Sequence, residues 1–378
     1  MKAKIIFTSV ILISLICVVS CKKNDEPPQS NGGQCNYKDA LYISVESNNK
    51  FAILVVDVNT MQLLEVFETP YLTSSIEVTD DGKYWYLLGA YSGGGATRTL
   101  TKINSQTGSI INEIETNYSS MVLSDNSNMF FLYNWWVVPV YPKHPFVDKN
   151  TLEIIYEDSI TGVTSAAFSP NNTLFLGKHN EVIEYDINDF TIIRKIPIST
   201  QIQTSFTVND ISFSKDAKFL FLTEIEHDRG PFIVINLDAE LIDFIHNVGS
   251  TSKIALSPNG KYLYISDPAG YGDDYPIPTN KIFRYDVQSK SMDIFINGGD
   301  ELGLMTNHMR TRELYVSNDN QFLYIHLTMP KQTIEGDRID IMKISTETGE
   351  LVNYFASPEE WTPAWILDMR LRKYRIWE

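Results

Sequence analysis

Residues 257–265 read Ser257-Pro258-Asn259-Gly260-Lys261-Tyr262-Leu263-Tyr264-Ile265, a polar turn followed by a strand of aromatic and branched residues. Weaker copies of this signature begin at positions 35, 79, 124, 169, 214 and 317, so successive copies lie 44, 45, 45, 45, 43 and 60 residues apart. A period in the forties with several strands per unit is typical of β-propellers rather than of helical solenoids. The sequence therefore predicts seven similar units.

Each unit has four candidate strands. A short apolar strand precedes the signature, as at 210–213, and an alternating hairpin follows it, as at 182–187 with 191–196. No stretch shows a sustained helical period, so we expect an all-β fold. One four-stranded sheet has two faces to bury and two open edges. Radial packing of several sheets buries the faces and leaves only short, protected edges. The prediction is a seven-bladed β-propeller with four-stranded antiparallel blades over residues 37–378.

The two ends of this region are predicted to close the ring. Residues Ala364 to Met369 read as the innermost strand of the first blade, whose other strands start near Ala40. A terminal strand borrowed from the far end of the chain leaves the ring without an unpaired edge.

Residues 1–20 are typical of a secretory signal peptide. Lys2 and Lys4 precede an apolar run from Ile5 to Val19, which is too short to span a bilayer comfortably. The run ends in Val18-Val19-Ser20-Cys21, which resembles the bacterial lipobox and implies acylation of Cys21. Several acyl chains would form a stable membrane anchor. An uncleaved N-terminal membrane helix, or a plain signal with a chance cysteine, is the alternative.

Residues 21–36 are expected to form a lipidated cysteine and a flexible tether. This stretch is polar and rich in proline and glycine, so it cannot bury apolar area. A lipidated cysteine followed by lysines and then acidic residues resembles lipoproteins of the Bacteroidota. The resemblance implies an outer-membrane lipoprotein, on the cell surface or on the periplasmic face.

Composition limits the partners. The chain has 31 basic and 47 acidic residues, a formal charge of −16 that becomes −18 without the two leader lysines. This balance disfavours nucleic acid and anionic lipid surfaces and is neutral toward sugars, peptides and cations. The predicted mature chain keeps Cys35 as its only unmodified cysteine, so no intramolecular disulfide and no cysteine-based metal cluster is expected. We predict no cofactor.

The repeats resemble the YVTN/YncE-type propellers and, more distantly, the lactonase-like seven-bladed family. The residues that carry the resemblance are the copy at 257–265 and its six relatives, spread over about residues 37 to 369. Such propellers host many activities, so the resemblance implies a fold and not a function. The lactonase-like relatives use charged residues near the channel mouth, which do not map onto this sequence one by one.

Long insertions mark one face of the predicted ring. In a propeller the loops joining the second and third strands of a blade, and those joining successive blades, gather on one face, which we call the loop face. Long segments are expected there at 134–145, 267–276 and 329–338, together with the insert 297–312. Insertions confined to one face mark it as functional.

Aromatic residues in these loops are candidate binding residues. Their flat, amphipathic rings suit stacking on a sugar or packing against a protein, although they could equally fill space over the rim. They are Trp135, Trp136, Tyr141, Tyr271 and Tyr275.

Charged loop residues are weaker candidates. Asp267, Asp273 and Asp274 could offer oxygen ligands to calcium, but they depart from the known calcium-loop spacing, which favours a solvated acidic loop. Candidates for acid–base chemistry are His227, Asp228, Arg229, His308 and Arg310, with a salt-linked surface loop as the alternative. No nucleophile elbow and no metal-binding histidine pair is present in the sequence.

Three functions remain open at this stage. The first is an envelope-anchored binding or scaffold module that presents its loop face to a glycan, a peptide or an envelope protein. The second is a lactonase-like or other hydrolytic propeller enzyme. The third is a structural subunit of an envelope complex.

Overall fold

The computed structural model describes the chain from residue 37 onward, with gaps. The described residues are 37–48, 50–79, 81–90, 98–124, 126–134, 143–202, 204–225, 230–248, 253–266, 281–298, 300–302, 304, 311–332, 338–361 and 365–375. The chain divides into two units, Met1–Cys35 and Asn36–Glu378, and every described residue belongs to the second. Within these ranges, 28 strands form seven four-stranded antiparallel sheets, which confirms the predicted fold class.

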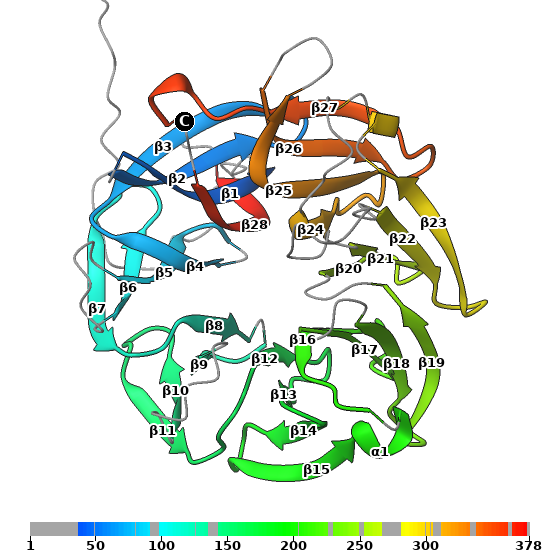
Figure 1. Ribbon diagram of the computed structural model, residues 1–378. Coiled ribbons are helices and arrows are strands. Elements are labelled where there is room, and N and C mark those ends of the chain that lie inside the picture. The colour runs from blue at the N-terminus through cyan, green and yellow to red at the C-terminus, as the bar shows by residue number, and fades with distance from the viewer. Residues whose placement is uncertain are drawn as a thin grey trace, which may run out of the picture. The chain divides into compact units, whose positions relative to one another are not determined.

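The seven sheets are the blades of a propeller (Figure 1). Written from the innermost strand outward, blade 1 is β28 (Trp365–Arg375), β1 (Tyr37–Ser47), β2 (Lys50–Asp57) and β3 (Gln62–Thr69); blade 2 is β4 (Leu72–Val78), β5 (Tyr84–Ala90), β6 (Arg98–Asn104) and β7 (Ile110–Thr116); blade 3 is β8 (Ser120–Leu123), β9 (Met129–Tyr133), β10 (His144–Asp148) and β11 (Ile154–Asp158); blade 4 is β12 (Ser165–Phe168), β13 (Leu174–Gly177), β14 (Glu181–Asp186) and β15 (Thr191–Pro197). Blade 5 is β16 (Val208–Phe213), β17 (Phe219–Glu224), β18 (Pro231–Asn236) and β19 (Leu241–Asn247); blade 6 is β20 (Ile254–Leu256), β21 (Tyr262–Ser266), β22 (Lys281–Asp286) and β23 (Ser291–Asn297); blade 7 is β24 (Thr311–Val316), β25 (Phe322–Gln332), β26 (Arg338–Ser345) and β27 (Leu351–Phe355). Short helices are α1 (Ser199–Ile202), η1 (Asp300–Leu302) and η2 (Glu359–Trp361).

The innermost strands form a closed ring around the channel. Each of β28, β4, β8, β12, β16, β20 and β24 contacts the next, and β24 returns to β28. Strand direction alternates within every blade, so second-to-third-strand and blade-to-blade connections leave from the loop face. The first-to-second and third-to-fourth-strand turns lie at the opposite end, which we call the turn face.

Ring closure depends on β28 pairing with β1, as the sequence predicts. Figure 1 shows the red C-terminal strand beside the blue N-terminal one, and the register runs from Tyr37↔Arg375 to Ile43↔Met369 and beyond. The strand reaches Arg375, further than the predicted end at Met369. The alternation of buried side chains continues beyond Met369, and Leu371 is also buried in the core between blades 7 and 1.

The repeated signature is the turn between the first and second strands. In blade 6 the Oγ of Ser257 accepts a hydrogen bond from the backbone N–H of Tyr262 (2.9 Å) and donates to Oδ1 of Asn259 (2.8 Å). The backbone N–H of Gly260 donates to the carbonyl of Ser257 (2.7 Å), and its φ of 75° is the left-handed conformation that glycine adopts without strain. A hydroxyl at the first position and a short polar side chain two residues later therefore set the turn.

Two segments expected to be loops contain strand instead. The structure places His144 and Pro145 in β10, where Pro145 pairs with Glu157. The predicted blade-7 loop at 329–338 is shorter, because β25 continues to Gln332 and pairs with β26 at Lys331↔Ile339. The β25–β26 ladder has a register shift between His326 and Lys331, and Pro330, which has no backbone N–H to donate, lies within this interruption.

A set of three side chains in blade 2 fastens it to blade 3. Tyr86, Lys102 and Asn112 lie opposite one another on β5, β6 and β7, and we call them the Tyr–Lys–Asn triplet. They donate to three consecutive carbonyls on the third-to-fourth-strand turn of blade 3: Tyr86 Oη to Lys149 (2.8 Å), Lys102 Nζ to Asn150 (3.3 Å) and Asn112 Nδ2 to Thr151 (2.5 Å). Each side chain satisfies a turn carbonyl that the next blade cannot satisfy itself.

Blade 7 uses the same triplet to hold blade 1, with Tyr324, Lys343 and Asn353 in the same register. The bonds are Tyr324 Oη to Val58 O (3.4 Å), Lys343 Nζ to Val58 O (2.8 Å) and Asn59 O (3.2 Å), and Asn353 Nδ2 to Thr60 O (3.1 Å). The ammonium of Lys343 also lies 4.0 Å from the ring centre of Phe322. Burial lowers the pKa of Lys343, the expected response of an ammonium removed from water.

Replacing Lys343 with methionine should therefore weaken the 7/1 junction. Loss of two hydrogen bonds from a charged donor, one of them to the buried carbonyl of Val58, is expected to cost about 1–3 kcal/mol of unfolding free energy. Urea denaturation checks this, and Lys50→Met on the exposed start of β2 is the control, expected to change stability by less than about 0.5 kcal/mol. Equal losses in both variants would contradict a specific role for Lys343.

Candidate functional site

The innermost strands around the channel carry a group of charged and phenolic side chains. They come from four of the innermost strands and from the residue before a fifth. They are Glu77 on β4, Asp210 on β16, Lys253 before β20, Glu313 and Tyr315 on β24, and Arg370 and Arg372 on β28.

The best-connected part of this group joins blades 7, 1 and 2. The guanidinium of Arg370 donates to Oε1 of Glu77 (3.2 Å) and to the hydroxyl of Tyr315 (2.9 Å), which itself donates to the carbonyl of Met369 (2.9 Å). Arg372 lies 3.7 Å from the second carboxylate oxygen of Glu77. Both oxygens of a carboxylate that is 7% exposed therefore face an arginine, as a buried charge requires.

The opposite side of the channel joins blades 5, 6 and 7. Asp210 accepts hydrogen bonds from the backbone N–H groups of Ile211 (3.0 Å) and Ile254 (3.1 Å), and Lys253 lies 3.8 Å from Glu313. Burial is the largest influence on Asp210 and raises the pKa of its carboxyl, against the lowering effect of Lys253. A carboxyl shifted in this direction exchanges protons closer to neutrality than an exposed aspartate does.

Tyr133, the last residue of β9, links the two sides electrostatically. Burial raises the pKa of Tyr133 to about 12, with smaller contributions from Lys253, Asp210 and Arg370. Charged groups from blades 1, 5 and 6 thus influence one phenol of blade 3. At neutral pH this phenol is protonated and can donate a hydrogen bond.

Asp210, Lys253 and Glu313 lie toward the loop-face end of the channel, whereas Glu77 and Tyr315 lie closer to the turn-face ends of their strands. Asp210 is the third residue of β16 and Glu313 the third of β24, and both strands start at the loop face. At the same end, Arg98 donates to the hydroxyl of Ser74 (3.2 Å), which bonds to the carbonyl of Ser119 (3.1 Å) in the next blade. The arrangement can hold a polar ligand through alternating donors and acceptors.

All candidate residues proposed from the sequence lie outside the described residues. The binding candidates are Trp135, Trp136, Tyr141, Tyr271 and Tyr275; the acid–base candidates are His227, Asp228, Arg229, His308 and Arg310; the calcium candidates are Asp267, Asp273 and Asp274; the lipidation site is Cys21. The strands that flank them are described, and their ends fix where these segments leave the propeller.

Two titratable residues near these segments are described. Glu224 ends β17, two residues before the segment that begins at 226, and is fully buried. His144 begins β10, is buried, and packs against the rings of Phe131 (5.7 Å) and Tyr118 (5.8 Å). Burial is the main cause that lowers the pKa of His144, so this imidazole is held neutral and serves the core.

Sequence reasoning missed the channel residues. The available signal was position: Asp210, Lys253 and Glu313 each stand four residues before the first hydroxyl residue of the repeated turn, and Glu77 and Tyr315 stand two residues before it. Aligning the seven units on that turn would have shown charges at fixed positions of innermost strands.

Within the described ranges, no three histidine, cysteine, aspartate or glutamate side chains gather closely enough to hold a metal ion. A search of the same ranges for bilayer-spanning helices finds none, and α1 has only four residues.

The fold, though not the sequence, is similar to known proteins. No protein-family model and no curated protein matches the chain. A provisionally assigned 6-phosphogluconolactonase from Bacteroides uniformis superimposes with a TM-score of 0.61 at 15% identity, covering 88% of this chain and 99% of that one. A protein of unknown function from Desulfotomaculum acetoxidans gives 0.61 at 13% identity over 89% and 99%, and hydrazine synthase from Kuenenia stuttgartiensis gives 0.56 at 13% over 73% and 77%. At these identities the likeness concerns the seven-bladed fold.

Arg370→Met should destabilise the propeller strongly, because it leaves the buried carboxylate of Glu77 without its nearest cation. The expected loss is about 3–5 kcal/mol, reduced by whatever Arg372 still supplies. Adding Glu77→Gln should recover much of it, and a double-mutant cycle from urea denaturation measures the coupling. Lys143→Met, which removes the exposed Lys143–Glu157 pair, is the control with little expected effect. A coupling energy near zero would contradict this account of the channel.

Proposed function

We propose that this chain is an envelope-anchored lipoprotein whose propeller is a binding or scaffold module for a glycan, a peptide or an envelope protein. The single observation that carries the proposal is the common direction of the blades. Because every blade has the same strand order, β5, β9 and β21 all end at the loop face, where the longer segments 91–97, 135–142 and 267–280 begin. Loops that converge on a rigid scaffold are the usual place for binding.

The channel residues Asp210, Lys253 and Glu313 support a polar ligand at this face. Lys253 lies 3.8 Å from Glu313, and Asp210 accepts hydrogen bonds from the backbone N–H groups of Ile211 and Ile254, so this end of the channel has a wall of charged groups at fixed positions. Such a wall orients a ligand without committing charges to a reaction. The aromatic candidates Trp135 and Trp136 would add flat apolar surface in the segment between β9 and β10.

A hydrolytic function is the second candidate, favoured by the fold shared with the provisionally assigned lactonase. His227, Asp228, Arg229, His308 and Arg310 would then act near the channel mouth. A lactonase should lose turnover on substitution of His227 or His308 while its circular dichroism spectrum stays unchanged.

Trp135→Ala combined with Trp136→Ala should weaken glycan binding by roughly tenfold or more, since each ring contributes about 0.5–1.5 kcal/mol through stacking. Affinity electrophoresis through polysaccharide gels and a glycan array measure the effect. Ile193→Ala on the outer strand β15, where the side chain is 49% exposed, is the control for loss of exposed apolar surface. Unchanged retention of the double variant would remove the aromatic residues from the binding site.

Cys21→Ser should release the protein from membranes, because the substituted residue cannot be acylated. Fractionation followed by mass spectrometry of the N-terminal peptide tests this, with Cys35→Ser as the matched cysteine control that keeps the anchor. Membrane association of Cys21→Ser equal to that of the unaltered protein would contradict the proposed lipid anchor.

A further inference from the structure

Blade 6 departs from the Tyr–Lys–Asn triplet that fastens blades 2 and 7 to their neighbours. The equivalent positions, opposite one another on β21, β22 and β23, are Tyr264, Arg284 and Asp293. The tyrosine is kept, the lysine is replaced by arginine, and the asparagine is replaced by a carboxylate that cannot donate a hydrogen bond.

These two replacements turn the cation away from the next blade. Arg284 donates to both carboxylate oxygens of Asp293, from Nη2 at 2.7 Å and from Nε at 3.4 Å, within its own blade. The three positions that would receive the triplet are residues 346–348 on the turn between β26 and β27 of blade 7. Asp293 cannot donate to these carbonyls, and both hydrogen bonds of Arg284 go to Asp293.

An ion pair between the third and fourth strands of a blade does not by itself prevent a hydrogen bond to the next blade. In blade 4 the charges are reversed, with Glu184 on β14 opposite Arg194 on β15. There Arg194 binds Glu184 (2.6 Å) and still donates to the carbonyl of Leu237 in blade 5 (2.7 Å). The 6/7 junction differs because its arginine lies on the inner strand and its carboxylate on the outer one.

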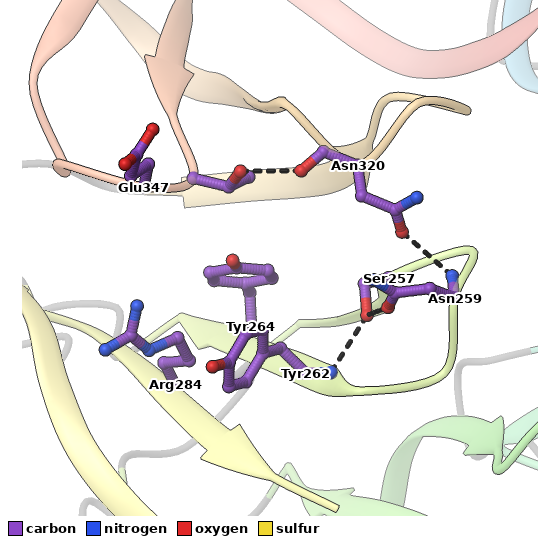
Figure 2. Close-up of a pocket in the computed structure, with 8 residues that line it drawn as sticks. Ser257, Asn259, Tyr262, Tyr264, Arg284, Asn320 and Glu347 are labelled. Carbon is purple, nitrogen blue, oxygen red and sulfur yellow. Dashed lines mark hydrogen bonds between the residues drawn. The ribbon is translucent and has the colours of Figure 1, made fainter.

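A groove of about 300 Å³ lies at this junction on the turn face (Figure 2). The rings of Tyr262 and Tyr264 rise between Arg284 on one side and the turn bearing Glu347 on the other. The far wall is fixed across the blades, because the backbone N–H of Asn259 donates to Oδ1 of Asn320 (2.8 Å). The hydroxyl of Thr346 donates to the carbonyl of Asn320 (2.6 Å), which ties the turn to the same wall.

The lining is polar, aromatic and electrically balanced. Hydroxyl and amide groups come from Ser257, Asn259, Asn320 and Thr346. The charged residues of the lining are one cation, Arg284, and one carboxylate, Glu347, whose formal charges cancel. Burial raises the pKa of Tyr264 to about 12, so its hydroxyl keeps its proton.

We infer that this groove is a second binding site, separate from the loop face, for a single neutral sugar unit. The turn carbonyls and Glu347 accept bonds from sugar hydroxyls, the amides and hydroxyls both donate and accept, and the tyrosine rings pack against apolar C–H groups. A balanced lining favours a neutral ligand over a charged one. The volume is at the lower end of ligand pockets, about 300–1,000 Å³, which suits one sugar ring and excludes a folded partner.

The test restores the triplet at the 6/7 junction. The variant R284K/D293N places the blade 2 and blade 7 side chains in blade 6, and it should fill the groove with bonds to residues 346–348. Glucose, galactose, mannose and N-acetylglucosamine are titrated separately into the full mature chain by calorimetry and ligand-observed NMR. We expect at least one to bind the unaltered protein, tenfold or weaker binding to R284K/D293N, and a higher melting temperature for that variant.

Two further variants keep the outcomes distinct. W135A/W136A should bind the sugar as the unaltered protein does, because these residues belong to the loop face. K102R/N112D makes the reverse change at the 2/3 junction and should lower the melting temperature without weakening sugar binding. The inference is overturned if none of the four sugars binds, or if R284K/D293N binds as tightly as the unaltered protein. Sugar binding lost only in W135A/W136A would place the sugar on the loop face, overturning this inference while supporting the proposed function.

Discussion

The pairing of β28 with β1 is the interaction on which the propeller depends. Every blade buries its two faces against its neighbours, so removing one contact between blades exposes two surfaces at once. The antiparallel ladder from Tyr37↔Arg375 to Glu46↔Trp365 joins the ends of the described chain within a single sheet. Blade 1 therefore has its innermost strand from one end of the chain and its other three from the other end, and no blade edge faces an open gap.

Because each blade packs against two neighbours, the side chains at the junctions between blades contribute to the stability of the ring. The junctions between blades differ in the contacts that hold them. Blades 2 and 7 donate a Tyr–Lys–Asn triplet to the next turn, blade 4 uses Arg194 at the equivalent place, and blades 3 and 5 have aromatic pairs there, such as Phe146 with Tyr185 and Phe232 with Tyr285. The first two satisfy backbone carbonyls, and the third removes apolar area from water. Blade 6 has polar side chains without the cross-blade bonds of lysine and asparagine, and a groove remains there.

The sequence predicted the fold because its information is local and repeated. A hydroxyl such as Ser257 followed by a short polar residue sets a turn, and alternation sets the strands; seven copies at one spacing then fix the blade number. The site was less accessible. The segment around Pro330 was expected to be a loop, whereas it belongs to a strand with an interrupted ladder. Glu77 and Arg370 form an ion pair although they lie 293 residues apart in the sequence. Alternation along a strand indicates which side chains share a face, but it does not indicate which residue of a neighbouring blade each of them meets.

The position of the chain ends has a consequence for the architecture itself. Tyr37 and Arg375 pair at the turn-face end of blade 1, so the first and last described residues are neighbours in the same sheet. A short covalent linker between them would convert blade 1 into an ordinary series of hairpins, and the backbone could then be cut at any exposed turn of another blade. The blade with which the polypeptide begins can thus change while the order of the blades around the axis stays the same. Circularly permuted chains should reach the same ring from seven different starting blades.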